Sequence, residues 1–229
     1  MARKAPPKPP PKPPNDDRTL DELRLALAPE IARAAVFDGW TEQALHQAAA
    51  HAGVDPAVAR LAFPGGAMDM IAAWIDATDA RMQAHFADGH LDTLKIRDRI
   101  RTLLLFRLDA VAGMEEALRR ALAIQAMPQN LPRTLKIGWQ SADAMWRLAG
   151  DTATDYNHYT KRALLIGVYS ATLAVFVEDE SEGKTETRAF LDRRIENVMQ
   201  FEKAKAQLLN NREGFDMARF LGRLRYPSR

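Results

Sequence analysis

Hydrophobic side chains recur at the three- and four-residue spacing of amphipathic helices along almost the whole chain, and the alternation typical of strands is nearly absent. This pattern predicts an all-α protein. The predicted helices cover residues 20–27, 29–37, 41–51, 55–62, 66–88, 91–110, 113–126, 133–149, 153–178, 186–210 and 214–225.

Residues that favour helix ends fix several of these boundaries. Pro29 suits the first turn of a helix, so it separates the first two predicted helices. Gly39, Gly53 and Gly150 each follow an apolar helical run, where a left-handed residue commonly ends the helix.

The helices predicted at 133–149 and 153–178 are apolar on nearly every side. Such a helix either lies at the centre of a bundle or faces a partner or an apolar ligand. Two of them in one small bundle favour a lipid-sized cavity or a dimer seam. The prolines that bound 128–132 predict a non-helical connection before the first helix, and Thr152-Ala-Thr-Asp155 predicts a capping box at the second.

The corner between these two helices is crowded with functional groups. A structural corner needs only a glycine and a cap, yet this one also carries Asp151, Asp155, Asn157, His158, Tyr159 and Arg162. We therefore place a recognition surface there.

The amino-acid composition and the motifs exclude several kinds of functional site. The absence of cysteine excludes a disulfide framework, a thiolate zinc site and a cysteine nucleophile. Asp155 and His158 form a single acid-x-x-His element, whereas a di-iron site needs two such elements and two further acids, so we predict no metal. The sequence has no phosphate-binding glycine loop and no catalytic-triad pattern, and we predict neither an enzyme nor a cofactor.

Charge is distributed unevenly along the chain. The net charge is +2, but residues 1–14 carry four positive charges and no acid, and residues 215–229 carry a net +3. The body between them is therefore acidic. The proline- and lysine-rich segment 1–18 is predicted to be a disordered arm, without the apolar region of a secretory signal. No apolar run approaches the roughly 20 residues that span a bilayer.

Residues 31–69 resemble the three-helix DNA-binding domain of TetR-type regulators. The resemblance rests on the aromatic-Asp-Gly-Trp corner at 37–40, on the alanine-rich turn at 48–54 and on the Phe-Pro exit at 63–64. It implies a TetR-like fold, with a helix-turn-helix domain before a helical bundle.

The helix that would read DNA lacks the groups for doing so. It reads Asp-Pro-Ala-Val-Ala-Arg-Leu, and Arg60 is its only cation. The regulators usually carry Tyr where Arg60 stands and Lys where Gly66 stands. Residues 29–88 have a net charge of −5, the wrong sign for a polyanionic partner. We therefore predict a degenerate helix-turn-helix that binds no nucleic acid.

The corner carries a longer resemblance. Three motifs lie at or near this corner: Met-Pro-Gln-Asn-Leu-Pro at 127–132, Ala-Gly-Asp at 149–151 and Thr-Asp-x-Asn-x-Tyr-Thr-x-Arg-Ala at 154–163. They resemble those of the TetR-fold lipid-binding accessory family of coenzyme Q (ubiquinone) biosynthesis, that of the ninth COQ protein. The likeness runs from about residue 29 to residue 200. It implies a non-enzymatic homodimer that holds an isoprenoid quinone or another lipid and presents intermediates to the di-iron hydroxylase of demethoxyubiquinone.

The resemblance implies three sets of site residues. The predicted docking patch for the hydroxylase comprises Asp143, Met145, Asp151, Asp155, Asn157, His158, Tyr159 and Arg162. Family members in mitochondria commonly carry Trp where His158 stands, so the affinity for the partner, or its identity, could differ here. The predicted apolar pocket comprises Ile96, Ile100, Leu103, Leu104, Phe106, Trp139, Trp146, Leu165 and Tyr169, each of which could equally be ordinary core.

The third set lies at the C-terminus, where a short basic amphipathic helix is predicted to contact the membrane. Its predicted membrane-facing residues are Phe215, Arg219, Phe220, Leu221, Arg223 and Leu224. A docked or frayed terminal helix is the alternative.

The expected organisation is an arm at 1–18, a degenerate helix-turn-helix domain at 19–64, a lipid-binding and dimerisation domain at 65–212 and the basic helix at 213–229. We expect the protein on the cytoplasmic face of the cytoplasmic membrane, or on the mitochondrial matrix face in a eukaryotic host. The alternatives are a ligand-responsive transcription regulator and a quinone-modifying enzyme.

Overall fold

The computed structural model describes residues 18–152 and 156–213, and the side chains of these residues up to 201 except that of Tyr156. Helices make up almost all of this part of the chain, and no strand occurs within it. In order, they are α1 (Leu20–Asp38), α2 (Glu42–His51), α3 (Pro56–Ala62), α4 (Ala67–His85), η1 (His90–Thr93), α5 (Ile96–Asp109), α6 (Glu115–Gln125), η2 (Pro128–Asn130), α7 (Leu131–Leu148), α8 (Tyr156–Phe176), η3 (Glu182–Lys184) and α9 (Thr185–Glu213). The fold is all-α, as predicted.

Helix α1 is continuous, and the predicted break at Pro29 is wrong. Pro29 lies inside the helix, where it removes one backbone hydrogen bond. Leu27 and Ile31 on either side of it are fully buried in the core, and this packing offsets the lost bond. The helix begins with a capping box between Thr19 and Glu22 and ends at Gly39, whose φ of 71° suits glycine.

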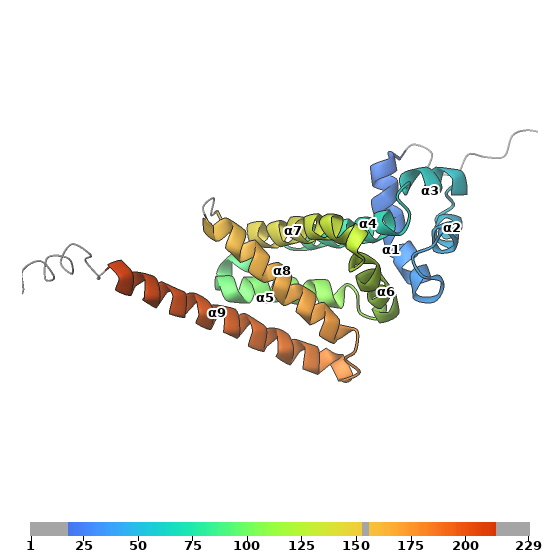
Figure 1. Ribbon diagram of the computed structural model, residues 1–229. Helices are drawn as coiled ribbons and strands as arrows, with labels where there is room; N and C mark the ends of the chain where they lie inside the picture. Colours follow the sequence, from blue (N-terminus) through green and yellow to red (C-terminus); the bar gives the residue numbers. More distant parts are fainter. Residues whose placement is uncertain (1–17, 153–155, 214–229) are drawn as a thin grey trace, which may run out of the picture.

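Helices α1, α2 and α3 gather at one end of the molecule (Figure 1). Asp55 caps α3 by accepting a hydrogen bond from the backbone N–H of Ala57 at 2.7 Å. This three-helix unit is fixed to the rest of the protein. The indole Nε1 of Trp40 donates to the carbonyl oxygen of Ala117 in α6 at 2.9 Å, and the Trp40 ring lies 5.4 Å from that of Trp74 in α4.

The remaining helices form a bundle in which α8 packs between α7 and α9, and α9 also contacts α5. The long helix α9 runs along the outside of this bundle and extends past it (Figure 1). One hydrophobic core extends from Leu23 in α1 to Leu191 in α9. None of the helices in the described part of the chain has the length and apolarity to cross a membrane.

Two predicted boundaries need correction. The single helix predicted at 91–110 is divided into η1 and α5, because the backbone is extended at Leu94 and Lys95. The connection predicted at 128–132 is a short 3-10 turn, and α7 already begins at Leu131. Pro132 lies in the first turn of α7, where a helix needs no backbone N–H. The predicted capping box falls largely on 153–155, outside the described residues.

Candidate functional site

The corner between α7 and α8 is built on one buried arginine. Only 2% of the Arg162 side chain is exposed. Its Nε donates to Oδ1 of Asp143 at 2.7 Å, and its Nη1 donates to Oδ2 of Asp151 at 3.1 Å and to the carbonyl oxygen of His158 at 3.0 Å. Arg162 therefore joins the end of α7, the segment after it and the start of α8.

Two further cations complete this network. Lys161 Nζ lies 2.6 Å from Oδ1 of Asp151, and Arg147 Nε lies 2.8 Å from Oδ2 of Asp143. Each carboxylate is thus shared between Arg162 and a second, more exposed cation. Because charges removed from water must be fully paired, this network fixes the geometry of the corner.

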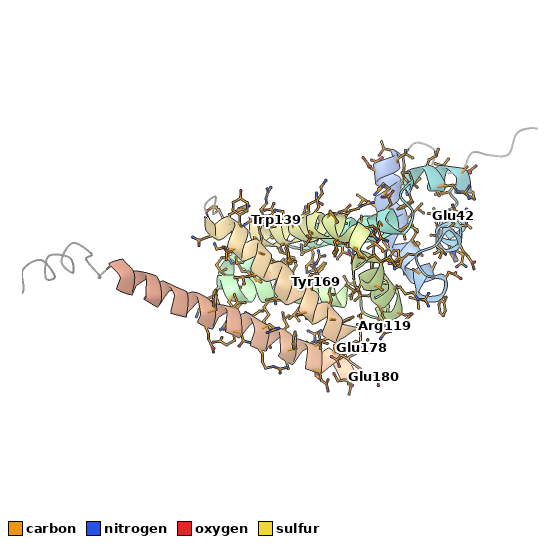
Figure 2. All side chains as sticks on the ribbon, viewed as in Figure 1. Glu42, Arg119, Trp139, Tyr169, Glu178 and Glu180 are labelled. Atoms are coloured by element: carbon orange, nitrogen blue, oxygen red, sulfur yellow. The ribbon has the colours of Figure 1, made fainter. Side chains whose placement is uncertain are left out.

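The outer surface of the corner is aromatic. The ring of Tyr159 lies 5.9 Å from that of Trp139 on α7 and 5.2 Å from that of His158, and the Tyr159 side chain is 62% exposed. Trp139 lies on the outer side of α7 (Figure 2). Leu135, one helical turn before Trp139, is also 62% exposed and extends this apolar surface. A contiguous exposed apolar patch of this kind is typical of an interaction site.

In the structure, some of the predicted docking residues are exposed, and others are buried beneath them. Asn157 and Tyr159 are exposed and His158 is partly exposed. Met145 and Arg162 are buried, so their prediction as contact residues is wrong. The prediction assumed that charged residues close to the corner in sequence would be exposed, but Arg162 is charged and buried. Asp143 and Asp151 are mostly enclosed by the ion network and act as its anions. Asp155 lies outside the described residues.

A cavity of about 520 Å³ lies beside the corner, between α5, α8 and α9. Five of the predicted pocket residues line it: Ile96, Ile100, Leu104, Trp146 and Leu165. Helix α9 supplies a wall that sequence reasoning missed, formed by Ile195, Val198 and Met199. The volume lies within the roughly 300–1,000 Å³ typical of small-molecule sites.

The cavity and the aromatic corner adjoin each other. Asp151, Asn157 and Lys161 line the cavity at the end where the corner begins. An open groove between α8 and α9 shares Leu164 and Val198 with the cavity and reaches Tyr159. The groove therefore borders the cavity and extends from it to the aromatic surface.

The other predicted pocket residues lie elsewhere. Leu103 is fully buried in the core and does not line the cavity. Phe106 packs against the rings of His85 and Phe86, at 5.0 and 5.4 Å. Trp139 belongs to the aromatic surface, and Tyr169 lines a second cavity. The amphipathic pattern identified the apolar sides of these helices, but it did not show which side borders empty space.

Ion pairs hold α9 against α5. Arg101 Nη2 lies 3.0 Å from Oδ2 of Asp192, and Arg188 Nη2 lies 2.7 Å from Oδ1 of Asp109. The hydrogen bond from Arg101 lowers the pKa of Asp192 below its ordinary value. These pairs are partly exposed, so they position α9 more than they stabilise it.

The helix-turn-helix surface differs from one that binds DNA. Arg60, the cation of α3, lies 3.3 Å from Glu42 and 3.2 Å from the ring of His46, both in α2. Glu42 lies on the outer side of the three-helix unit (Figure 2). The guanidinium therefore already has a carboxylate partner within the domain.

Comparison with known proteins agrees with this architecture. Residues 131–202 match the COQ9 family model. The rat protein named "Ubiquinone biosynthesis protein COQ9, mitochondrial" is 31% identical over 182 residues, which cover 76% of this chain and 58% of the rat protein. The human protein of the same name is 28% identical, over 76% of this chain and 57% of its own length. The chain thus spans less than two thirds of these relatives.

A solved structure shares the fold. The TetR transcriptional regulator from Nitrosomonas europaea superimposes with a TM-score of 0.62 and 22% identity, over 78% of this chain and 99% of that protein. The matched family segment, 131–202, contains the α7–α8 corner and the α8 and α9 walls of the cavity. The chain has a TetR-like fold, and its residues 131–202 are similar to the COQ9 family, whose matched members are named as ubiquinone biosynthesis proteins.

Proposed function

We propose that this protein is a non-enzymatic accessory protein of ubiquinone biosynthesis. It holds an isoprenoid quinone intermediate or another lipid in the cavity between α5, α8 and α9. It presents that molecule to a di-iron quinone-ring hydroxylase, the demethoxyubiquinone hydroxylase, at the membrane surface. Similarity to the COQ9 family supports the pathway, and the cavity supports the ligand class.

The observation that carries the proposal is that the cavity lies directly beside the exposed aromatic corner and borders a groove that reaches it. A carrier must enclose an apolar molecule and yet release it where the partner docks. Each enclosed CH₂ contributes about 0.8 kcal/mol, so an apolar cavity offsets the cost of leaving the bilayer. The groove along Leu164 and Val198 supplies a route from the cavity to Tyr159.

The docking surface in this proposal is the aromatic surface of Trp139, His158 and Tyr159, with Asn157 beside it. Aromatic side chains at the centre of a patch are typical of residues that dominate binding energy. The ion network beneath them holds the two helices in fixed relation, so the surface is formed before the partner arrives.

The protein acts as a homodimer in this proposal, and the basic segment 213–229 contacts anionic lipid. Residues 214–229 of this segment lie outside the described residues, so this part rests on the sequence alone. A membrane-surface location is compatible with the mitochondrial names of the relatives. In a bacterial host, the corresponding site is the cytoplasmic face of the cytoplasmic membrane.

The alternative is a ligand-responsive transcription regulator, for which the shared fold is the supporting observation. The acidic helix-turn-helix region and the pairing of Arg60 with Glu42 weigh against it. An operator-binding assay separates the two functions. The carrier proposal predicts no retardation of DNA at physiological salt.

The ligand site is tested by substitutions that place a large side chain in the cavity from opposite walls. Ile100→Trp on α5 and Val198→Trp on α9 each introduce an indole where the lipid would lie. The protein is purified from a ubiquinone-producing host, and the extracted lipid is quantified per protein. The proposal predicts that both variants lose bound lipid, whereas Val58→Trp, on the partly exposed α3 surface, retains it. Retention of lipid by folded cavity variants would place the ligand elsewhere.

A further inference from the structure

A third cavity, of about 370 Å³, lies where α1 packs beside α4 and the three-helix unit meets the bundle (Figure 1). Its walls come from α1, α4 and the turn between α5 and α6. It shares no lining residue with the cavity between α5, α8 and α9. Its volume lies within the roughly 300–1,000 Å³ typical of small-molecule sites.

Two arginines from neighbouring helices line this cavity, Arg33 on α1 and Arg81 on α4. No acidic residue is among the described residues that line it. Arg33 forms an ion pair with Glu30, one turn earlier on α1. Arg81 forms no hydrogen bond or ion pair with any residue in the described part of the chain. The cavity lining therefore has one positive charge that no carboxylate compensates.

The unpaired state of Arg81 contrasts with its surroundings. Residues 29–88 have a net charge of −5, so acidic side chains are plentiful in this part of the sequence. The planar guanidinium of an arginine matches a carboxylate, to which it can donate two parallel hydrogen bonds. An anion that enters the cavity can supply the acceptors that the protein itself does not.

The rest of the cavity lining is mostly apolar. It includes three alanines, Pro29 and Met114. The side chain of Trp74 also lines the cavity, and its ring lies 5.4 Å from that of Trp40 in the three-helix unit. Apolar walls favour a ligand with an apolar body, because each apolar group that leaves water there contributes to binding.

We propose that this third cavity binds a small monocarboxylate with an apolar body, whose carboxylate pairs with Arg81. One negative charge matches the one uncompensated cation of the lining, whereas a phosphate monoester carries about −1.5 to −2 at pH 7. The site is separate from the cavity of the proposed carrier function, and it stands or falls independently of that function.

The test compares benzoate with three analogues on the full chain. Benzamide has the ring without the charge, acetate has the charge without the ring, and phenyl phosphate has a greater charge. Binding is followed by NMR through the indole ¹H–¹⁵N signal of Trp74, one of four tryptophans. Benzoate is expected to shift this signal to saturation. Benzamide and acetate should each bind about 10-fold more weakly, because each lacks either the charged hydrogen bonds or the apolar contact.

Three variants locate the site. Arg81→Gln removes the unpaired cation and is expected to weaken benzoate binding about 10-fold while the affinity for benzamide stays the same. Arg193→Gln is the matched control, because it removes the charge of an exposed arginine on α9 and should preserve benzoate binding. Ala112→Trp fills the cavity from the exposed turn between α5 and α6, and it should abolish binding.

Equal affinity for benzoate and benzamide would overturn the proposal, as would unchanged benzoate binding in Arg81→Gln. Tighter binding of phenyl phosphate would assign the site to another class of anion and would also contradict it. An equal loss in Arg193→Gln would show that benzoate responds only to net charge, and benzoate binding by folded Ala112→Trp would place it elsewhere. The comparison of Arg81→Gln with Arg193→Gln decides the matter if Ala112→Trp does not fold.

Discussion

Arg162 donates from Nε to Oδ1 of Asp143 across 2.7 Å, and this bond joins α8 to α7 beneath an exposed aromatic surface. The contact explains why the corner carries so many polar groups. Part of them form a buried framework, and part of them remain on the surface that the framework supports. Charge at this corner therefore has a structural role as well as the proposed role in docking.

Replacement of Arg162 should lower the free energy of unfolding far more than replacement of the exposed Arg147. Arg162→Met leaves Asp143 and Asp151 without their shared buried cation, and we expect a loss of about 3–5 kcal/mol in the free energy of unfolding. Arg147→Ala removes a cation that is 75% exposed and also pairs with Asp143, and should cost under about 1 kcal/mol. Urea denaturation measures both. Similar losses in the two variants would show that the network does not stabilise the corner.

Removal of the surface aromatics should weaken docking without unfolding the protein. Tyr159→Ala truncates an exposed side chain, and we expect the Kd for the hydroxylase to rise about 30-fold, as for an interface residue worth about 2 kcal/mol. His158→Ala should weaken binding in the same direction. Titration calorimetry provides the measurement.

The matched control for that experiment is Phe37→Ala, which removes an 84% exposed aromatic side chain from the three-helix unit. Its Kd should equal that of the parent protein. If Phe37→Ala impaired binding as much as Tyr159→Ala, the docking surface would lie at the other end of the molecule. If Tyr159→Ala unfolded the protein, its ring would belong to the core.

Much of this architecture follows from the sequence pattern. Where a prediction from the pattern was wrong, the reason is physical. The periodicity predicted the helices, and Ile100 and Leu104 lie on the expected apolar side of α5. The pattern could not show that α1 continues through Pro29, because tertiary packing outweighs one lost hydrogen bond. It could not identify the α9 wall, because a cavity between distant helices depends on how they pack.

The sequence gives only a weak indication of the buried polar group of Arg107 and Asp79 beside the second cavity. Arg107 lies within the apolar run from Leu103 to Leu108, in a register that buries it. A lone charge on the buried side of a helix predicts a buried partner, and Asp79 on α4 fulfils that role. Sequence alone could not pair the two, because 28 residues separate them and the register of α4 against α5 sets their contact.

The α8–α9 turn should confer a pH-dependent part of the stability. Asp179 accepts hydrogen bonds from the backbone N–H groups of Ser181 and Thr187 at 2.9 and 2.8 Å. Burial raises the pKa of Asp179, but these bonds and those from the two hydroxyl groups outweigh it and hold the pKa well below the ordinary 3.8. The stabilisation is therefore complete above about pH 4 and decreases as the pH falls toward the lowered pKa.

Asp179→Asn tests that dependence. The variant keeps the shape of the side chain and removes its charge, so it should be less stable than the parent protein at pH 7. The difference in the free energy of unfolding should narrow as the pH falls below about 4, where the parent protein loses its advantage. A difference that stayed constant from pH 7 to pH 3 would contradict the assignment.

Removal of residues 214–229 should reduce membrane association. The segment carries Arg219, Arg223 and Arg225 among apolar residues, so its loss removes attraction to anionic lipid. We expect less co-sedimentation with anionic vesicles and little change in the melting temperature. Unchanged co-sedimentation would place the membrane contact elsewhere.

The central claim is that the protein encloses a lipid, and native mass spectrometry tests it most directly. The protein is purified from a ubiquinone-producing host, its intact mass is recorded, and the bound material is extracted and identified. The proposed function predicts a dimer that carries a quinone, an isoprenoid or a phospholipid. An empty protein that instead retards operator DNA would contradict it and assign the chain to transcription.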